Sequence, residues 1–563
     1  MKHSIRSGAL AAALAAALAC VRLVAPSSSP ASAPISVAVV WNVAPPSYAD
    51  PSVEAAEVAL TAPTILGGPL RAARAHPGAK FAIALDPTEL VGLERAASGA
   101  TMLDLLASGR AQANDPRVGD MLRAMSHQPV VSAELARTSG GKRFAALAGA
   151  APLALAGAEA ARFSSRDLAD FAGTSALLWL AASGDAAKAS PQLSKSDVDA
   201  RAALAALSRA DADVLSLLKS EVAAGGVELV AKPGGDPVLP LLIDSAGKTS
   251  LDPYVVEVNA SADAGRLVED AIAAVQRFEP SGRAIGVYSP FGAYDDATAD
   301  LLSRRRAAFG LFSDRVLSGS GLGSSAESVA TAEAAALHPY SLQIGKDRAL
   351  PAMFWIQDES DSLNATPSAW PVSAMGDRLV GLANDGGAAA AKVPGAHLLV
   401  VSVDADGPWG RRADRQRVLD DIAARLSGSP GIVATTPGQF ARDHTIAAIS
   451  YGFAAGSSAG SFALWMGSSA QASLWSALLA ARAAAGGDAS LDRAATRDPL
   501  LAAESGAWFE AVALPESSSA VNRALTKYRG LLAQVYRATG KRVPSPIAPV
   551  KLEVPAVLTT PAP

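Results

Sequence analysis

Acidic and aromatic side chains stand at the ends of separate apolar runs in this sequence. Trp41 closes the run 35–41, and Asp404 directly follows the run 397–403. Parallel β/α barrels place their catalytic groups at the carboxyl ends of such strands. An aromatic face can also stack on a sugar ring, although core packing is the commoner role for any single aromatic residue. Asp404 could equally do no more than cap a turn, so both interpretations stay open for each residue.

The composition disfavours several other kinds of chemistry. The six histidines are scattered without metal-ligand spacing, and Cys20 is the only cysteine. If Cys20 is removed or lipidated, the mature chain has no thiol for a disulfide or a nucleophile. No G-x-G-x-x-G fingerprint opens a helix, and at a net charge of −4 no Lys/Arg run offers a nucleic-acid surface. We therefore expect no metal, no cofactor and no nucleic-acid partner.

Apolar runs of strand length alternate with helical patterns along most of the chain. The runs cover residues 35–41, 81–85, 227–230, 284–288 and 397–403. Between them, residues 267–278 and 411–426 carry apolar positions on one helical face. This alternation predicts a parallel α/β architecture, and the residues at several strand ends favour a barrel over an open sheet. Beyond about residue 440, the segments 470–485 and 517–539 predict helices.

The length of 563 residues suits a large barrel with an accessory domain. At the N-terminus, Lys2 and Arg6 precede a short apolar run, which is typical of a signal peptide and too short for a good membrane span. The small residues before Cys20 are similar to a bacterial lipoprotein signal; ordinary cleavage nearby is the alternative. The predicted boundaries are 1–20 for the signal peptide, 21–34 for a Ser/Pro/Ala linker, 35–440 for the barrel, 441–545 for a C-terminal helical domain and 546–563 for a Pro-rich tail.

Seven segments, in order along the chain, resemble motifs of glycoside hydrolase family 57, a family of α-amylase type. Residues 226–242 (GVELVAKPGGDPVLPLL) resemble G-x-I-E-L-T-T-T-P-x-x-H-P-I-L-P-L-L, 286–292 (GVYSPFG) resemble G-x-W-P-S-E-G, 309–317 (FGLFSDRVL) resemble G-x-x-W-x-x-T-D-E-x-V-L, 354–361 (FWIQDESD) resemble F-R-D-x-x-L-S-D, and 403–409 (VDADGPW) resemble L-D-G-E-N-A-W. Residues 461–467 (SFALWMG) and 503–509 (AESGAWF) are similar to N-F-R-I-W-I-G and A-E-G-S-D-W-F. Each motif is weak alone, but their shared order indicates relatedness.

The resemblance implies a distorted (β/α)7 barrel, a helical domain that closes one side of the cleft, an α-glucan-type substrate and a retaining mechanism. That mechanism needs two carboxyl groups, one as nucleophile and one as acid/base. Asp404 stands at the family's acid/base position, but Phe291 stands where the family has its nucleophilic Glu. Asp295 and Asp296 follow nearby, and we expect them to cap the next helix.

The resemblance also assigns substrate-binding positions, several of them altered. Where the family has W-H-x-H-Q-P, this chain has Trp41 and Asn42 followed by VAPP, so the His and Gln are lost. Glu228 is kept, as a substrate-binding carboxylate or as a paired buried acid, whereas Asp236 replaces a family His. The other candidate positions are Tyr288, Trp355, Asp361, Asp406, Trp409 and Trp508.

These observations lead to one main hypothesis and two alternatives. The main hypothesis is an exported relative that binds an α-glucan or another oligosaccharide and has impaired or lost hydrolase activity. The first alternative is an active retaining α-glycosidase or α-glucanotransferase with another nucleophile. The second is an envelope scaffold with a vestigial cleft. In each case we expect a periplasmic, cell-envelope or secreted location, with a lipid at Cys20 as the only membrane attachment.

Overall fold

The computed structural model of the chain describes residues 34–44, 51–110, 115–126, 133–155, 163–195, 198–246, 248, 256–317, 335–366, 369–392, 394–405, 412–449, 452–515 and 518–544. The predicted signal peptide with Cys20, nearly all of the predicted linker, and the tail lie outside these residues. The candidate positions Asp406 and Trp409 also lie outside them.

Seven parallel strands form a closed ring, which confirms the predicted (β/α)7 barrel in an uneven form. The ring consists of β1 (Ile35–Asn42), β2 (Phe81–Leu85), β3 (Val227–Ala231), β4 (Val287–Tyr288), β5 (Gly310–Ser313), β7 (Arg348–Trp355) and β8 (Leu398–Asp404). Its order is β7-β5-β4-β3-β2-β1-β8, and β7 closes onto β8 through the single pair Trp355↔Val400. By contrast, β1 and β8 pair along their length up to Asn42↔Asp404. The ring is therefore paired along nearly the whole length of β1 and β8 but closed by one residue pair between β7 and β8.

Three further strands extend the sheet outside the ring. They are β6 (Tyr340–Ile344), which is antiparallel to β7, β10 (Ala447–Ile449), which pairs with β6, and β9 (Ile432–Ala434), which pairs with β1. Strand pairing therefore continues to Ile449, within the segment that the sequence assigned to the C-terminal helices.

Side chains alternate between the inside and the outside of the ring, as the two-residue period of a strand requires. On β1, Ala38 and Val40 belong to the interior cluster, whereas Val39 and Trp41 pack outward against the helices. The amino end of the ring is filled by α19 (Pro437–Asp443), whose Phe440 is fully buried in the interior cluster. The opposite end, where the strands have their carboxyl termini, is called the mouth below.

Helices cover the outside of the ring. They are α2 (Pro51–Ile65), α3 (Gly67–Ala75), α4 (Pro87–Ala97), α12 (Leu239–Ile243), α13 (Ser261–Gln276), α14 (Asp296–Arg304), α16 (Gln357–Asn364), α17 (Ala374–Ala390) and α18 (Arg415–Gly428). As predicted, Asp295 caps α14: its Oδ1 accepts a hydrogen bond of 2.7 Å from the Thr298 N–H. The amphipathic segments that were predicted around 267–278 and 411–426 correspond to α13 and α18.

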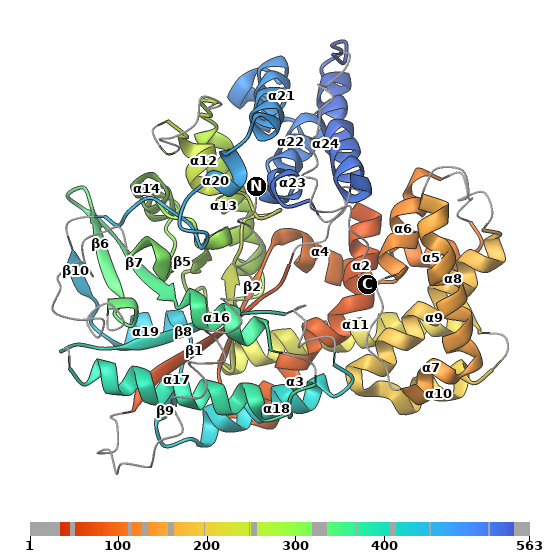
Figure 1. Cartoon of the computed structure of the whole chain (residues 1–563), viewed down its shortest axis with the longest axis horizontal. Helices are drawn as coiled ribbons and strands as arrows, with labels where there is room; N and C mark the ends of the chain where they lie inside the picture. The colour runs from red at the N-terminus through yellow and green to blue at the C-terminus, as the bar shows by residue number, and fades with distance from the viewer. Residues whose placement is uncertain are drawn as a thin grey trace, which may run out of the picture.

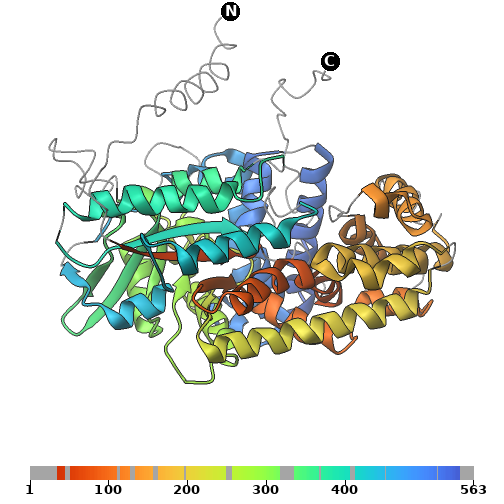
Figure 2. The same ribbon diagram turned by 90° about the horizontal axis from the view of Figure 1, so that it is seen from below.

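A large helical insertion between β2 and β3 was not predicted as a separate unit. Its helices are α5 (Met102–Ala107), α6 (Pro116–Ser126), α7 (Ala133–Arg137), α8 (Ser139–Leu155), α9 (Ser165–Leu180), α10 (Ala186–Leu193) and α11 (Ala200–Ala224). They pack around a hydrophobic core distinct from that of the barrel and extend to the right in Figure 1. Figure 2 shows the long helix α11 returning from the insertion to the barrel.

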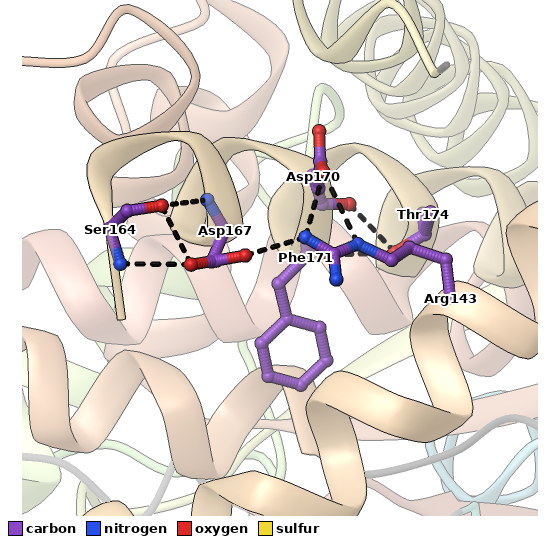
Figure 3. Close-up of polar contacts among 6 residues, drawn as sticks. All are labelled: Arg143, Ser164, Asp167, Asp170, Phe171 and Thr174. Atoms are coloured by element: carbon purple, nitrogen blue, oxygen red, sulfur yellow. Dashed lines mark hydrogen bonds and ion pairs between the residues drawn. The ribbon is translucent and has the colours of Figure 1, made fainter. Parts of the chain in front are cut away.

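One arginine fastens two helices of this insertion. Arg143 on α8 donates to Asp167 Oδ1 at 2.5 Å and to Asp170 Oδ2 at 3.0 Å, both on α9 (Figure 3). Asp167 also forms a capping box with Ser164 at the start of α9. These contacts hold α8 and α9 together on the polar side, while Phe171 belongs to the core beneath.

The C-terminal helices stand on the upper side of the barrel in Figure 1. They are α20 (Ala463–Met466), α21 (Ser469–Ala485), α22 (Ala494–Ala503), α23 (Gly506–Ala513) and α24 (Ser518–Ala538). Their buried residues join those of the barrel in one hydrophobic cluster, so the two parts share a core. No helix in the described part of the chain combines the length and apolarity needed to cross a membrane.

Candidate functional site

Asp404 ends β8 at the mouth and is held by two asparagines. Its Oδ1 accepts a hydrogen bond of 3.0 Å from Asn42 Nδ2, at the end of β1. Its backbone N–H donates to Asn364 Oδ1 at 2.9 Å, from the last residue of α16. The side chain is only partly buried. The position that the resemblance assigns to an acid/base is therefore an oriented carboxyl group at the open end of the ring.

A fully buried lysine, Lys232, lies beside this pair. It directly follows β3, and its Nζ donates to Asn42 Oδ1 at 3.2 Å and to the carbonyl oxygen of Val43. The same Nζ lies 3.2 Å from Asp236 Oδ1. Burial alone would lower the pKa of Lys232, but the surrounding carboxylates, Asp236 foremost, outweigh burial and raise it. Lys232 is thus a fixed cation linked to Asp404 through Asn42.

Asp236 is a second acidic residue at the mouth, linked to Asp404 through Lys232 and Asn42. Burial raises the pKa of Asp236 to about 6; the cation of Lys232 opposes this rise, while the negative charges of Asp86 and Asp404 add to it. About a fifth of the Asp236 side chain remains exposed. Its backbone has a φ of 50°, a left-handed conformation that aspartate tolerates better than most residues. The mouth therefore holds two carboxyl groups, those of Asp236 and Asp404.

We expect Asp236→Asn to flatten the pH dependence of stability between about pH 4 and pH 6. Because the pKa of Asp236 is raised in the folded state, its contribution to stability is fully present below the unfolded pKa of about 4 and is lost as the pH rises to about 6. The loss across this window is about 2–3 kcal/mol. Urea unfolding at several pH values would measure it. The exposed Asp358→Asn is the matched control, and equal slopes for wild type and Asp236→Asn would contradict the prediction.

Helix α23 covers the mouth next to Asp236. The Gly506 N–H donates to the Asp236 carbonyl oxygen at 3.0 Å. A Cβ at position 506 would lie 2.7 Å from that oxygen and 2.6 Å from Phe291 Cε2, so only glycine fits there. Further along α23, Glu510 is half-buried, and its pKa is raised by burial and by the charge of Asp236. The C-terminal helices thus bring a third carboxyl group to the mouth.

Phe291 follows β4 in the one-turn helix Pro290–Gly292 and packs between the barrel and the C-terminal helices. Its ring lies 4.7 Å from that of the buried Trp465, measured between centroids. Its φ of 57° is a left-handed conformation, which is a genuine outlier for so bulky a side chain. Such backbone strain clusters at functional sites. The backbone at this position keeps an unusual geometry, although its side chain is a hydrocarbon.

Solved structures of known enzymes are similar to this chain in overall fold. A glycoside hydrolase family 57 branching enzyme from Thermococcus kodakaraensis, solved with glucose, matches at a TM-score of 0.53 and 13% identity over 89% of this chain and 90% of its own. A family 57-type branching enzyme from Pyrococcus horikoshii matches at 0.54 and 13% identity over 91% and 96%. The chain has the fold of glycoside hydrolase family 57. The α-amylase AmyC from Thermotoga maritima also matches, at a TM-score of 0.50 and 10% identity over 90% and 94%. No family model matches the sequence, and no curated protein is similar to it in sequence.

Within this family 57 fold, Tyr288 and Trp355 fill the ring below the mouth. Their rings stack with centroids 4.8 Å apart, and both side chains are buried in the interior cluster. The Tyr288 hydroxyl lies 3.1 Å from Ser402 Oγ, and burial raises its pKa above the ordinary value. Trp355 Nε1 donates to Gln357 Oε1 at 2.7 Å. In this structure both aromatic residues pack in the core and offer no open face to a sugar.

Glu228 lies at the amino end of the ring, away from the mouth. It is the second residue of β3, and Lys232 comes four residues later, about 13 Å further along a strand. Its Oε2 accepts a hydrogen bond of 2.8 Å from the Gly438 N–H at the start of α19. Burial raises the pKa of Glu228, and this hydrogen bond lowers it in part. Of the two roles that the sequence left open, the structure favours the structural one, with Glu228 as a partly buried acid that anchors α19.

The remaining candidates occupy varied places in the family 57 fold. Trp41 is fully buried and meets Phe81 edge to face, so it has no surface for a ligand. Asp361 is exposed on α16 and accepts a hydrogen bond of 2.7 Å from Gln357 Nε2. Trp508 is half-buried on α23, and its Nε1 donates to the Ala502 carbonyl at 2.8 Å. In the described residues, no three His, Cys, Asp or Glu side chains gather where they could hold a metal ion.

Sequence reasoning missed Lys232 and Glu510. Lys232 ends an apolar strand just as Asp404 does, so the signal that singled out Asp404 was also present there. Glu510 gave no comparable signal, because its place at the mouth depends on how α23 packs against the residues after β3.

Proposed function

We propose that this chain is an exported protein of glycoside hydrolase family 57 fold that binds an α-glucan-type oligosaccharide and has impaired or lost retaining hydrolysis. The observation that carries the proposal is Phe291, which stands after β4 where the resemblance places the nucleophile and packs against Trp465. A phenyl ring cannot attack an anomeric carbon. Asp404 alone can fill only one of the two roles of a retaining site.

Binding is supported by the polar groups that stay at the mouth. Asp404, Asn42 and Lys232 form a hydrogen-bonded chain whose carboxylate end is partly accessible. The branching enzyme from Thermococcus kodakaraensis, which has a similar fold, was solved with glucose. A sugar hydroxyl at this mouth would meet the acceptor oxygens of Asp404 and Asn42 and, nearby, the cation of Lys232. Such polar groups orient a ligand in its site.

We expect hydrolysis of starch, pullulan and an aryl α-glucoside to be lower than that of a retaining enzyme with both carboxylates by on the order of 10⁴-fold or more. The physical reason is the missing nucleophile, since no covalent glycosyl intermediate can form on Phe291. Reducing-sugar release and aryl release would measure it, with Asp404→Asn as the matched variant. Phe291→Glu is expected to restore trace turnover at most, because the His and Gln of the first motif are also missing.

One alternative nucleophile has structural support. Asp236 is linked to Asp404 through Lys232 and Asn42, whereas Asp295 caps α14 and pairs with Lys248, and Glu228 lies at the far end of the ring. An active glycosidase that uses Asp236 is therefore the second candidate function. Clear turnover that both Asp404→Asn and Asp236→Asn abolish would replace our proposal with this one.

Export gives a separate prediction. We expect the native chain to carry a new N-terminus between about residues 20 and 34, because the positive segment and apolar run at its start have the pattern of a signal peptide. Mass spectrometry of the protein purified from its own source would show this terminus, and a diacylglyceryl mass on Cys20 would identify a lipoprotein. An intact Met1 would refute export.

A further inference from the structure

Trp370 is unusual among the large apolar side chains of the described residues. It is 46% exposed, and only Val433 and Leu514 share this degree of exposure. The other aromatic residues discussed at the mouth are buried or half-buried. An indole has a broad, polarisable face that suits the apolar face of a sugar ring. Among the described residues, Trp370 is therefore the aromatic side chain that is most available to a ligand.

Trp370 lies in the connection between α16 and α17, which follows β7 at the end of the ring where the strands have their carboxyl termini. It lies six residues after Asn364, whose side chain accepts the Asp404 N–H. Six residues of extended chain span at most about 20 Å, which bounds the distance from Asn364 to Trp370. The Trp370 carbonyl accepts a hydrogen bond of 2.7 Å from Arg412 Nη1, at the start of the segment that leads into α18. The connections that follow β7 and β8 therefore meet at Trp370.

The backbone at Trp370 is held by a partly buried ion pair between Arg412 and Asp414. Only 7% of the Arg412 side chain is exposed, and its Nε and Nη2 donate to the two carboxylate oxygens of Asp414 at 2.8 and 3.1 Å. Such a fork is rigid and directional, and it aims the remaining Nη1 at Trp370. A surface that is fixed before binding loses little conformational freedom when a ligand arrives. The structure thus exposes an indole on a pre-organised support.

We propose that Trp370 is an outer sugar-binding platform, on which a ring of a long oligosaccharide stacks beyond the residues around Asp404. The inference rests on the proposed oligosaccharide binding and adds a second contact region to it. It predicts that the protein discriminates by chain length: a short oligosaccharide occupies the mouth alone, whereas a longer one also reaches Trp370.

The test is isothermal titration of the full chain with maltotriose and with maltoheptaose. Trp370→Ala should weaken maltoheptaose binding about tenfold, the usual effect of losing one aromatic contact, and leave maltotriose binding unchanged. Trp370→Phe should restore most of the affinity, because a smaller aromatic face remains. Val433→Ala is the matched control, since Val433 is equally exposed on β9 near the amino end of the ring.

Three results would contradict the proposal that Trp370 is an outer platform. Wild-type binding of both sugars with unchanged affinities in Trp370→Ala would overturn the platform and leave the proposed function standing. An equal loss for both lengths would also overturn it, because Trp370 would then act within the inner site. If the wild type binds neither sugar, the proposed function fails, and the platform fails with it.

Discussion

Replacing Arg482 by methionine is expected to lower the free energy of unfolding by about 3–5 kcal/mol. Arg482 on α21 is largely buried and forks onto Asp263 of α13, with Nε 3.0 Å from each carboxylate oxygen and Nη2 2.7 Å from Oδ1. Asp263 is fully buried, and so is the neighbouring Glu504, whose pKa is raised well above its ordinary value by burial and then by Asp263. Removing the guanidinium would leave these acids buried without their cation.

Urea unfolding of Arg482→Met against wild type would measure this loss. Arg497→Met is the matched control, because Arg497 pairs with the largely exposed Asp498 on α22 and should contribute less than about 1 kcal/mol. A loss in Arg482→Met no larger than in the control would show that Asp263 and Glu504 adapt without the arginine. The ion pair joins the C-terminal helices to the barrel, so its loss should weaken that junction first.

Lys232→Met is expected to have the second large effect and to lower the free energy of unfolding by about 3 kcal/mol. The variant removes the cation that contacts Asp236, Asn42 and the Val43 carbonyl. Asp236 can take up a proton, because its pKa is already raised to about 6, and this limits the loss to the lower part of the usual range. Urea unfolding at pH 8, where Asp236 is charged, should show the largest difference from wild type.

The double variant Lys232→Met/Asp236→Leu is the control for this prediction. When both charges of a buried pair are replaced by apolar groups, the cost is often small, so the double variant should recover much of the lost stability. If it is as unstable as Lys232→Met, the lysine acts mainly through Asn42 and Val43. Maltotriose titration of both variants would then show whether the position of Asn42 beside Asp404 matters for binding.

The sequence by itself determined much of the barrel. Long apolar runs such as 35–41 and 397–403 are typical of strands buried on both faces, and their alternation with helices predicts a parallel sheet. The order of the motifs added the closed ring of seven strands, which the structure confirms. Asp295 as a helix cap also followed from local chemistry, since an aspartate before a helix satisfies the free N–H groups of its first turn.

The sequence did not separate the roles of side chains that share a strand. Glu228 on β3 and Lys232, which directly follows β3, lie on the same face because side chains alternate with a period of two, yet only Lys232 reaches the mouth. The direction of a parallel strand could have indicated this difference, because a residue at the start of a strand lies at the amino end of the ring and one after its last residue lies at the mouth. The sequence did not show that α19 fills that end of the ring and provides the Gly438 N–H that donates to Glu228.

Only the tertiary structure decided which aromatic residues are available to a ligand. Tyr288 and Trp355 come from strands far apart in the sequence and stack because the ring brings β4 and β7 to either side of β5. Trp370 is 46% exposed, and its backbone carbonyl is bound by Arg412 from the connection after β8. Local sequence sets the type of each side chain and the face of its strand. Its exposure depends on contacts between segments that are distant in the chain, and no local pattern records those contacts.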